Sequence, residues 1–347
     1  MRTFKYFAFI LLIAIIGTAI YIAVQPNKFS FSRSRVINAP ASVLFNKVND
    51  FKNWPEFSPW IELEPNLNIN YGSKTLGTGA SCSWEGKILG EGSMKTLAAN
   101  ENQFISQYIS ILKPYESESE IHWDFETADG GTKVTWSMSG EQDFISKMYT
   151  TFTGSIEKQN APDFERGLFK LDSTVTADMK KYSITVHGET DHGGGFYLYN
   201  STSCKINELE SKIAEMMPKV EDYANKNNIA TAGAPFVNYI VWDEQNNAVI
   251  FSACVPTTDR VITTDSDVLT GELPAFRAIK TTLKGHYSNL TEAWETARKY
   301  VSTDSLAIAE NGPMLEVYTT DQAKLPNPAD WITELYIAIK PETVTEE

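Results

Sequence analysis

An acidic residue stands inside an apolar stretch near the C-terminus of the chain. Residues 330–341 are rich in β-branched and aromatic side chains, which is typical of a β-strand. Side chains alternate between the two faces of a strand, so Glu334 shares a face with Ile332 and Tyr336. Because both faces are largely apolar, we expect an interior strand of a sheet that is covered on both sides. A carboxylate at such a position is costly without a partner, which makes Glu334 the first candidate for a functional group.

The chemistry open to such a carboxylate is binding of a cation or proton abstraction. Loss of water raises the pKa of a carboxyl group, and an entering cation restores its charged form. Aromatic rings nearby would add cation–π attraction on the order of 0.5 to 2 kcal/mol per contact. The same acid could serve as a general base on water towards an electrophilic substrate. The competing interpretation is a structural acid that is paired with Lys280, Lys284 or a backbone amide.

Composition limits the class of protein. The 347 residues allow two domains and an anchor, and 42% hydrophobic with 12% aromatic residues is ample for packed cores. The formal net charge of −14 argues against a nucleic-acid partner. Cys82, Cys204 and Cys254 lie far apart and belong to no metal-binding pattern, so we expect neither a disulfide framework nor a metal or other cofactor.

A segment near the N-terminus is apolar enough to cross a bilayer. Residues 6–24 carry no charged side chain, and about 20 such residues span a membrane. A cleaved signal peptide is the competing interpretation, but the apolar run is long for one and no clear cleavage site follows it. We expect an uncleaved single-pass anchor with the bulk of the chain in a periplasm-like space.

The next part of the sequence, residues 30–178, predicts an α+β domain. A strand over residues 29–37 precedes a short helix that begins after Pro40 and a second, broken helix over residues 50–60. Five strand-like runs follow, separated by turn signals, at residues 78–86, 90–98, 103–112, 117–127 and 132–140. One long helix over residues 144–178 closes the domain. This order makes a curved antiparallel sheet that grips a helix.

Two motifs in this domain carry a family resemblance. Residues 36–40 (Val-Ile-Asn-Ala-Pro) with Phe45, and the aromatic- and proline-rich residues 51–60, resemble the opening of the polyketide cyclase/START-like (SRPBCC, helix-grip) superfamily. The resemblance implies a hydrophobic cavity between sheet and long helix, without implying an enzyme. Trp84, Trp123 and Trp136 lie on predicted strands and are candidates to line that cavity, although we expect such residues to be core more often than not.

Residues 183–341 predict a second domain that contains an internal repeat. After an opening strand at residues 182–187, each half reads β-α-β-β, with helices near residues 206–225 and 290–301. Proline occurs at matching points of both halves, and the two final strands end at Pro256 and Pro341. Two such modules side by side form a sheet with two helices on one face. We expect a ligand groove between the halves, on the other face.

This second domain resembles the GyrI-like, AraC-type effector-binding domain. The resemblance rests on residues 285–294, on residues 233–236 and 311–313, and on the final strand. It implies that the acid of that strand, here Glu334, lies in the pocket, and it places Tyr287 and Trp331 at matching aromatic positions. Some members of that family hydrolyse strained electrophiles. No DNA-binding segment precedes the domain, which departs from transcriptional regulators.

Three hypotheses follow. The first is a membrane-anchored protein that binds a hydrophobic or cationic small molecule through Glu334, Trp331, Tyr287 and Tyr336. The second is a hydrolase in which Glu334 is the base and Tyr287 the proton donor. The third is an interaction module whose cavities are filled cores. We rank the enzyme second because no catalytic triad can be assembled from the sequence.

Overall fold

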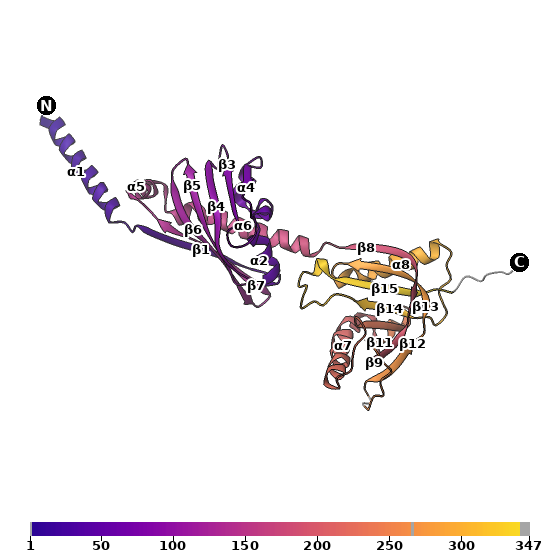
Figure 1. Cartoon of the computed structure of the whole chain (residues 1–347). Coiled ribbons are helices and arrows are strands. Elements are labelled where there is room, and N and C mark those ends of the chain that lie inside the picture. The colour runs from indigo at the N-terminus through magenta and orange to yellow at the C-terminus, as the bar shows by residue number, and fades with distance from the viewer. Residues whose placement is uncertain (1, 265–266, 341–347) are drawn as a thin grey trace. The chain divides into compact units, whose positions relative to one another are not determined.

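The computed structural model describes residues 2–264 and 267–340, with the side chains of Arg2 and Thr3 left out. The chain divides into two compact units, Met1–Asp178 and Met179–Glu347, which are described separately. Both are α+β with an antiparallel sheet, as the sequence predicts. Helix α1 (Arg2–Val24) opens the first unit (Figure 1). Its segment Phe4–Val24 is long and apolar enough to cross a membrane.

The first unit is built on a seven-stranded antiparallel sheet. The strands are β1 (Lys28–Ile37), β2 (Asn68–Tyr71), β3 (Ser81–Glu85), β4 (Glu91–Asn100), β5 (Phe104–Lys113), β6 (Ser117–Ala128) and β7 (Gly131–Glu141). The helices are α2 (Ala41–Asn49), η1 (Phe51–Asn53), α3 (Trp54–Phe57), α4 (Pro59–Leu63), α5 (Phe144–Thr153) and α6 (Ile156–Met179). The sheet order is β1-β7-β6-β5-β4-β3-β2. Figure 1 shows α6 lying along this sheet. Helix α6 buries Phe164, Leu168 and Leu171, which gives the expected helix-grip arrangement.

Two features of the first unit differ from the sequence-based prediction. The single helix expected over residues 144–178 is wrong, because Gly154 separates α5 from α6. Its φ of 104° and ψ of 157° lie in a region that only glycine adopts readily, so the helix cannot continue through it. Strand β2 was not predicted; its four residues are mostly exposed, and they show little of the apolar alternation that marks a longer strand.

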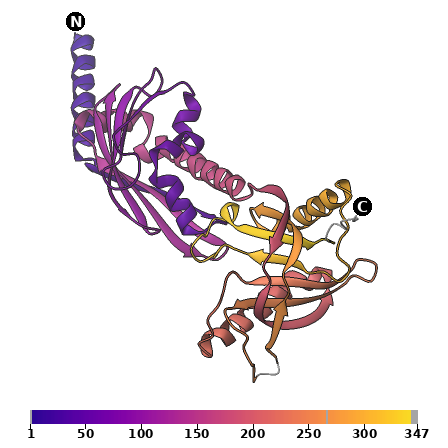
Figure 2. The same cartoon turned by 45° about the vertical axis from the view of Figure 1, so that its right-hand side comes forward.

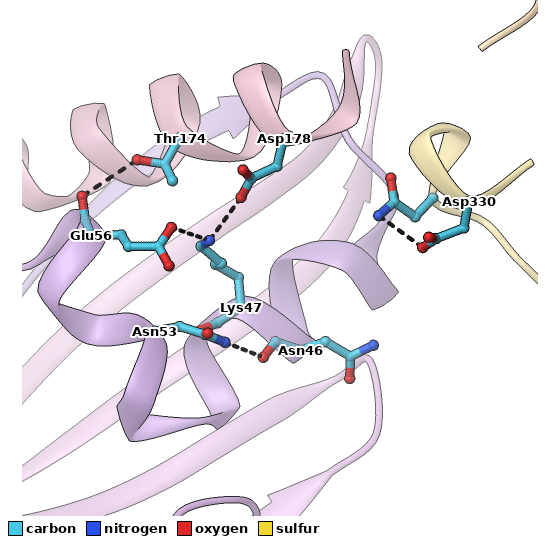
Figure 3. Close-up of polar contacts among 8 residues, drawn as sticks. Asn46, Lys47, Asn53, Glu56, Thr174, Asp178 and Asp330 are labelled. Carbon is cyan, nitrogen blue, oxygen red and sulfur yellow. Dashed lines mark hydrogen bonds and ion pairs between the residues drawn. The ribbon is translucent and has the colours of Figure 1, made fainter. Parts of the chain in front are cut away.

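A nearly buried lysine ties the short helices to the end of α6. Lys47 on α2 donates to Glu56 at 2.6 Å and to Asp178 at 2.7 Å, and its side chain is 12% exposed (Figure 3). Burial alone would lower the pKa of Lys47. The two carboxylates together raise it by more, so the net shift of this pKa is upward. The charged form is therefore favoured. The aromatic-rich short helices are thus fixed against the long helix by more than apolar contact.

The second unit is an eight-stranded sheet in the order β12-β9-β11-β10-β14-β15-β13-β8. Its strands are β8 (Ser183–His192), β9 (Gly195–Lys205), β10 (Phe236–Asp243), β11 (Ala248–Thr257), β12 (Leu269–Leu273), β13 (Phe276–Lys284), β14 (Met314–Tyr318) and β15 (Ile332–Ala338). Its helices are η2 (Ile206–Glu208), α7 (Leu209–Lys226), η3 (Tyr287–Asn289), α8 (Leu290–Thr303) and η4 (Pro328–Asp330). Figure 2 gives a second view of this sheet and its helices.

The predicted repeat is present in the second unit. One half is β9-α7-β10-β11 and the other is β13-α8-β14-β15, and the halves meet where β10 pairs with β14. Helices α7 and α8 bury their apolar stripes against the same face of the sheet. Helix α7 runs through Pro218 without ending there. Pro341, the expected end of the last strand, lies outside the described residues.

Strand β15 is interior, as predicted, because β14 and β13 flank it. Its two faces are nevertheless not equally covered, which corrects our expectation. Leu335 and Ile337 pack into the core beneath α7 and α8. Glu334 and Tyr336 point to the other face, where both side chains are only partly buried. The apolar composition of β15 therefore reflects a helix-covered face and a partly open aromatic face.

Candidate functional site

The interior of the first unit is filled by stacked aromatic rings. Trp123 and Trp136 stack with ring centroids 4.3 Å apart, and Phe164 of α6 stacks on Trp136 at 4.1 Å. None of these three side chains is exposed to solvent. They occupy the space between sheet and long helix where the family resemblance implies a cavity. Trp123 and Trp136 are therefore core residues, as we expected, while Trp84 on β3 is partly buried.

In the second unit, two glutamates lie on opposite faces of the sheet. Val317 of β14 is directly opposite Glu334 of β15, so these two side chains share a face. Glu316 is one residue earlier on β14 and therefore points to the other face, towards the helices. Glu316 is 2% exposed, whereas the side chain of Glu334 is 23% exposed. The more deeply buried acid is thus one that the sequence analysis did not single out.

Glu334 already has a cationic partner on its own face. Its Oε1 lies 2.8 Å from Lys280 Nζ on the neighbouring strand, and Tyr336 donates to Oε2 at 2.7 Å. Burial raises the pKa of Glu334, but the hydrogen bonds from Lys280 and Tyr336 lower it, and the net shift is downward. This corrects the expected upward shift, which assumed a carboxylate without a nearby cation. Lys284, the other partner considered, pairs instead with Asp330 at 3.1 Å.

The partly open face around Glu334 carries an aromatic group. His192 stacks on Phe276 with ring centroids 4.7 Å apart and meets the edge of Tyr336 at 5.1 Å. Burial lowers the pKa of His192, and the Glu334 carboxylate opposes that shift only in part, so the neutral imidazole is favoured. Of the four predicted ligand residues, Glu334 and Tyr336 thus lie together, in an ion-paired cluster next to neutral aromatic rings.

Glu316 is held by three neutral donors, in what we call the Glu316 cluster: Glu316, Tyr239, Trp294 and Tyr318. Trp294 Nε1 and Tyr239 Oη donate to Oε2 at 2.9 and 3.1 Å, and Tyr318 Oη donates to Oε1 at 2.5 Å. Burial raises the pKa of Glu316, the three hydrogen bonds lower it, and the net shift is upward. All hydrogen bonds found for this carboxylate among the described residues come from uncharged groups. Its charge is thus solvated by the protein without being neutralised.

Several elements meet at this cluster. Tyr239 comes from β10 of the first half, Glu316 and Tyr318 from β14 of the second, and Trp294 from α8. The ring of Tyr239 meets Trp294 edge-on with centroids 5.7 Å apart. Burial raises the pKa of Tyr239 and of Tyr318 well above the ordinary value, so both hydroxyls stay protonated and remain donors. The junction of the two repeats thus places a preformed donor set around one carboxylate.

Tyr287 and Trp331 belong with Glu316 and not with Glu334. Their rings lie 5.0 Å apart, and Tyr287 packs against Tyr318 at 5.3 Å. Trp331 precedes the start of β15, which corrects our assignment of this residue to the strand. The four predicted ligand residues therefore separate into two pairs. The geometry does not bring Glu334 and Tyr287 together as base and acid, because Tyr287 packs on the face to which Glu316 points.

The sequence pattern around Glu316 resembles the pattern that made Glu334 a candidate. Glu316 also stands between apolar neighbours, Leu315 and Val317, in a strand-like run. The run is short, and β14 spans only Met314–Tyr318, so its pattern was weaker. The contact with Trp294 depends on how α8 packs on the sheet, which spacing alone does not reveal. No group of three or more potential metal ligands occurs among the described residues.

Two protein families match separate regions of the chain. Residues 37–169 match the family described as polyketide cyclase / dehydrase and lipid transport, and residues 197–340 match the GyrI-like small molecule binding domain. No curated protein matches the chain significantly.

Solved structures that align with part of the chain include the C-terminal domain of EcmrR, which is 14% identical. The match covers 46% of this chain and 98% of that one, with a TM-score of 0.40. Ara h 8.0201 is 16% identical over 42% of this chain and 99% of its own, with a TM-score of 0.33. Protein MLL2253 from Mesorhizobium loti is 16% identical over 42% and 98%, with a TM-score of 0.32. By the family matches, an N-terminal apolar helix is followed by a region that matches the polyketide cyclase/dehydrase (SRPBCC) family and by a region that matches the GyrI-like small molecule binding domain.

Proposed function

We propose that the protein is a membrane-tethered receptor whose GyrI-like unit binds a lipophilic, cationic small molecule at the Glu316 cluster. The observation that carries this proposal is the hydrogen bonding of Glu316. Its carboxylate is 2% exposed, and its partners are the neutral groups of Trp294, Tyr239 and Tyr318. A buried carboxylate without a counter-ion is expensive, and an organic cation would remove that cost.

The aromatic rings around the cluster suit the same ligand. Tyr287, Trp331 and Tyr318 form a continuous aromatic group that begins at the carboxylate and ends at partly exposed rings. Each ring face in contact with a cation would contribute on the order of 0.5 to 2 kcal/mol. Tyr287 and Trp331 therefore keep the role that the sequence analysis proposed for them, next to a different acid. Opening of the cluster by side-chain movement would admit the ligand to Glu316.

Glu334 is the weaker candidate for this role. Lys280 already neutralises its carboxylate at 2.8 Å, and a cationic ligand would have to displace that lysine. The pKa of Glu334 is lowered, so a cation gains nothing by ionising it. A ligand contact at Glu334 stays a prediction, and Glu334→Gln serves as the matched control for Glu316→Gln.

The tether is the part of the proposal that rests on α1. Its segment Phe4–Val24 has a mean hydropathy of 2.7 and only 6% of it is buried. A water-exposed surface of this kind is costly, and a bilayer would remove the cost. A signal sequence has the same composition, and the N-terminal mass of the mature protein distinguishes the two. We propose the anchor, with the two units outside the cytoplasm.

A thermal-shift comparison on the full chain in lipid nanodiscs tests the ligand proposal. The probes are tetraphenylphosphonium and its uncharged analogue triphenylphosphine oxide, applied to the parent, Glu316→Gln and Glu334→Gln. Ligand that binds only the folded state raises the melting temperature by mass action. We expect the cation to stabilise the parent and Glu334→Gln, and to have little effect on Glu316→Gln.

Other outcomes would point elsewhere. Equal stabilisation by both probes in all three proteins would show binding of apolar groups without use of the carboxylate. Loss of the effect in Glu334→Gln alone would move the site to the other face of the sheet. The absence of any shift in the parent would contradict ligand binding and favour the interaction-module hypothesis.

A further inference from the structure

Helix α5 presents its apolar side to the outside. Beside Thr151 and Thr153, its exposed residues are large and apolar: Phe144 (48%), Ile145 (64%), Met148 (43%), Tyr149 (54%) and Phe152 (71%). Its polar residues Ser146, Lys147 and Thr150 point the other way, and Lys147 is 6% exposed. A helix on a water-facing surface normally shows the opposite arrangement. The environment that matches the outer side of α5 is therefore apolar.

Helix α5 is in direct contact with the end of α1. Lys147 Nζ donates to the carbonyl oxygen of Ala23 at 3.3 Å, in the last turn of α1 where carbonyls lack helical partners. Just before α5, the backbone N–H of Gln142 donates to the carbonyl of Asn27 at 2.6 Å. Ile22 of α1 is 2% exposed, although the residues around it are open. Helix α5, with its apolar side facing outward, thus lies beside the end of the candidate membrane segment.

Other exposed apolar side chains lie at the same end of the sheet. The register places the start of β1 next to the end of β7, where α5 follows, and the end of β5 next to the start of β6. Leu112, which is 53% exposed, lies near the end of β5, and Tyr115, which is 75% exposed, lies in the connection after that strand. The connection between β3 and β4, at that same end by register, carries Ile88 (67% exposed). We call α5, Leu112, Tyr115 and Ile88 the apolar end of the first unit.

We propose that the apolar end of the first unit inserts shallowly into the bilayer that α1 spans, with α5 lying in the interface. An interfacial amphipathic helix buries its apolar face about 5–10 Å into the boundary between headgroups and acyl chains. The ten residues of α5 place five large apolar side chains on that face. The inference rests on the tether of the proposed function and is independent of ligand binding at Glu316.

The charges at this end indicate which lipids would bind. Glu116, Glu118 and Asp143 are exposed there, as is Lys87, while Lys28 pairs with Glu141 at 3.9 Å and Lys113 pairs with Glu91, so the acidic groups outnumber the basic ones. Attraction to anionic headgroups therefore does not account for the contact, and burial of apolar surface must drive it. A bilayer of uncharged phosphatidylcholine should suffice, and anionic lipid should not strengthen the insertion.

Photolabelling of the full chain in phosphatidylcholine nanodiscs tests the proposal. An aryl diazirine dissolved in the lipid labels residues that reach the hydrocarbon, and peptide mass spectrometry locates the label. We expect label on α1, on α5 and at Tyr115. The peptide that carries Ile262, an apolar side chain of the second unit that is 91% exposed, should stay unlabelled as a control for general affinity.

A double variant tests the role of the helix face. Met148→Glu with Phe152→Glu changes two exposed side chains and leaves the buried core untouched. It should lose the label on α5 and keep the label on α1, whereas Ile262→Glu should change neither. Label on α1 with none on α5 in the parent overturns the insertion of α5 and leaves the anchor standing. The absence of label on α1 itself overturns both the anchor and the insertion, and neither result bears on the thermal-shift experiment.

Discussion

The indole Nε1 of Trp294, on helix α8, donates a hydrogen bond of 2.9 Å to the carboxylate of Glu316, on strand β14. This bond joins a helix to the sheet by a polar contact inside an apolar core. It means that movement of α8 would change the environment of the acid directly.

Affinity for a lipophilic cation should rise with pH. Burial raises the pKa of Glu316, so at low pH the cation must displace a proton, and at higher pH it meets a carboxylate that is already charged. Below the folded-state pKa, affinity should change by up to about tenfold per pH unit. Isothermal titration calorimetry in buffers of different ionisation enthalpy would count the protons released. Glu316→Gln should bind weakly at every pH, and an affinity that falls with rising pH in the parent would count against the proposal.

Glu334→Gln should reduce stability at neutral pH by about 1 kcal/mol, since the pair with Lys280 is partly exposed. The folded-state pKa of Glu334 is lowered, so its contribution is present above the unfolded-state pKa and is lost as pH falls through the folded-state value. The unfolding free energies of parent and variant, measured with urea from neutral to acidic pH, should therefore converge as the pH falls. Glu316, whose pKa is raised, has the opposite sign: its contribution is present at low pH and is lost as pH rises. If the difference in unfolding free energy between the parent and Glu334→Gln grew on acidification, the lowered pKa of Glu334 would be contradicted.

Gly167→Ala should destabilise the first unit although alanine favours helices. A Cβ at this position would lie 2.6 Å from Cζ3 of Trp136 and 3.1 Å from Cδ of Pro59. Overpacking of this kind costs about 1–3 kcal/mol. Urea unfolding would measure the loss, and Ser173→Ala, at an exposed position of the same helix, is the control and should be close to neutral. If Gly167→Ala were as stable as the parent, the aromatic stack would have room to move.

Gly154→Ala should weaken the junction between α5 and α6. The φ of 104° and ψ of 157° of Gly154 are strained for any residue with a Cβ, at about 1–3 kcal/mol. Hydrogen exchange should show faster opening of α5 backbone amides than in the parent. Thr151→Ala, at an exposed position of α5 whose hydroxyl donates to the Lys147 carbonyl of the same helix, should leave that exchange nearly unchanged. Equal exchange rates in all three proteins would show that the glycine conformation is not required.

The repeat and the strand faces of the second unit could be predicted from sequence because each depends on local periodicity. The alternation along β15 correctly separated Glu334 and Tyr336 from Leu335 and Ile337. The assignment of covered faces failed because an apolar strand looks the same whether helices or partly open aromatic rings lie against it. Lys280 was considered as a partner of Glu334, but only the register of β13 against β15 brings the two side chains together.

The Glu316 cluster could not be assembled from sequence because its members come from both halves of the repeat and from a helix. Tyr239 and Glu316 are distant in sequence and meet through the pairing of β10 with β14. In the first unit, residues 144–178 form two helices, which are separated at Gly154 with its positive φ. Helix periodicity on either side of it is continuous enough to hide the break.

Only Gln25, Pro26 and Asn27 connect α1 to β1. Three residues reach at most about 10 Å when fully extended, so this linker is too short to let the first unit move far from the end of α1. With α1 in a bilayer, the first unit cannot leave the surface, and the whole protein diffuses in two dimensions. Compounds that partition into lipid would then be met at their concentration in the membrane, which for lipophilic molecules greatly exceeds that in water.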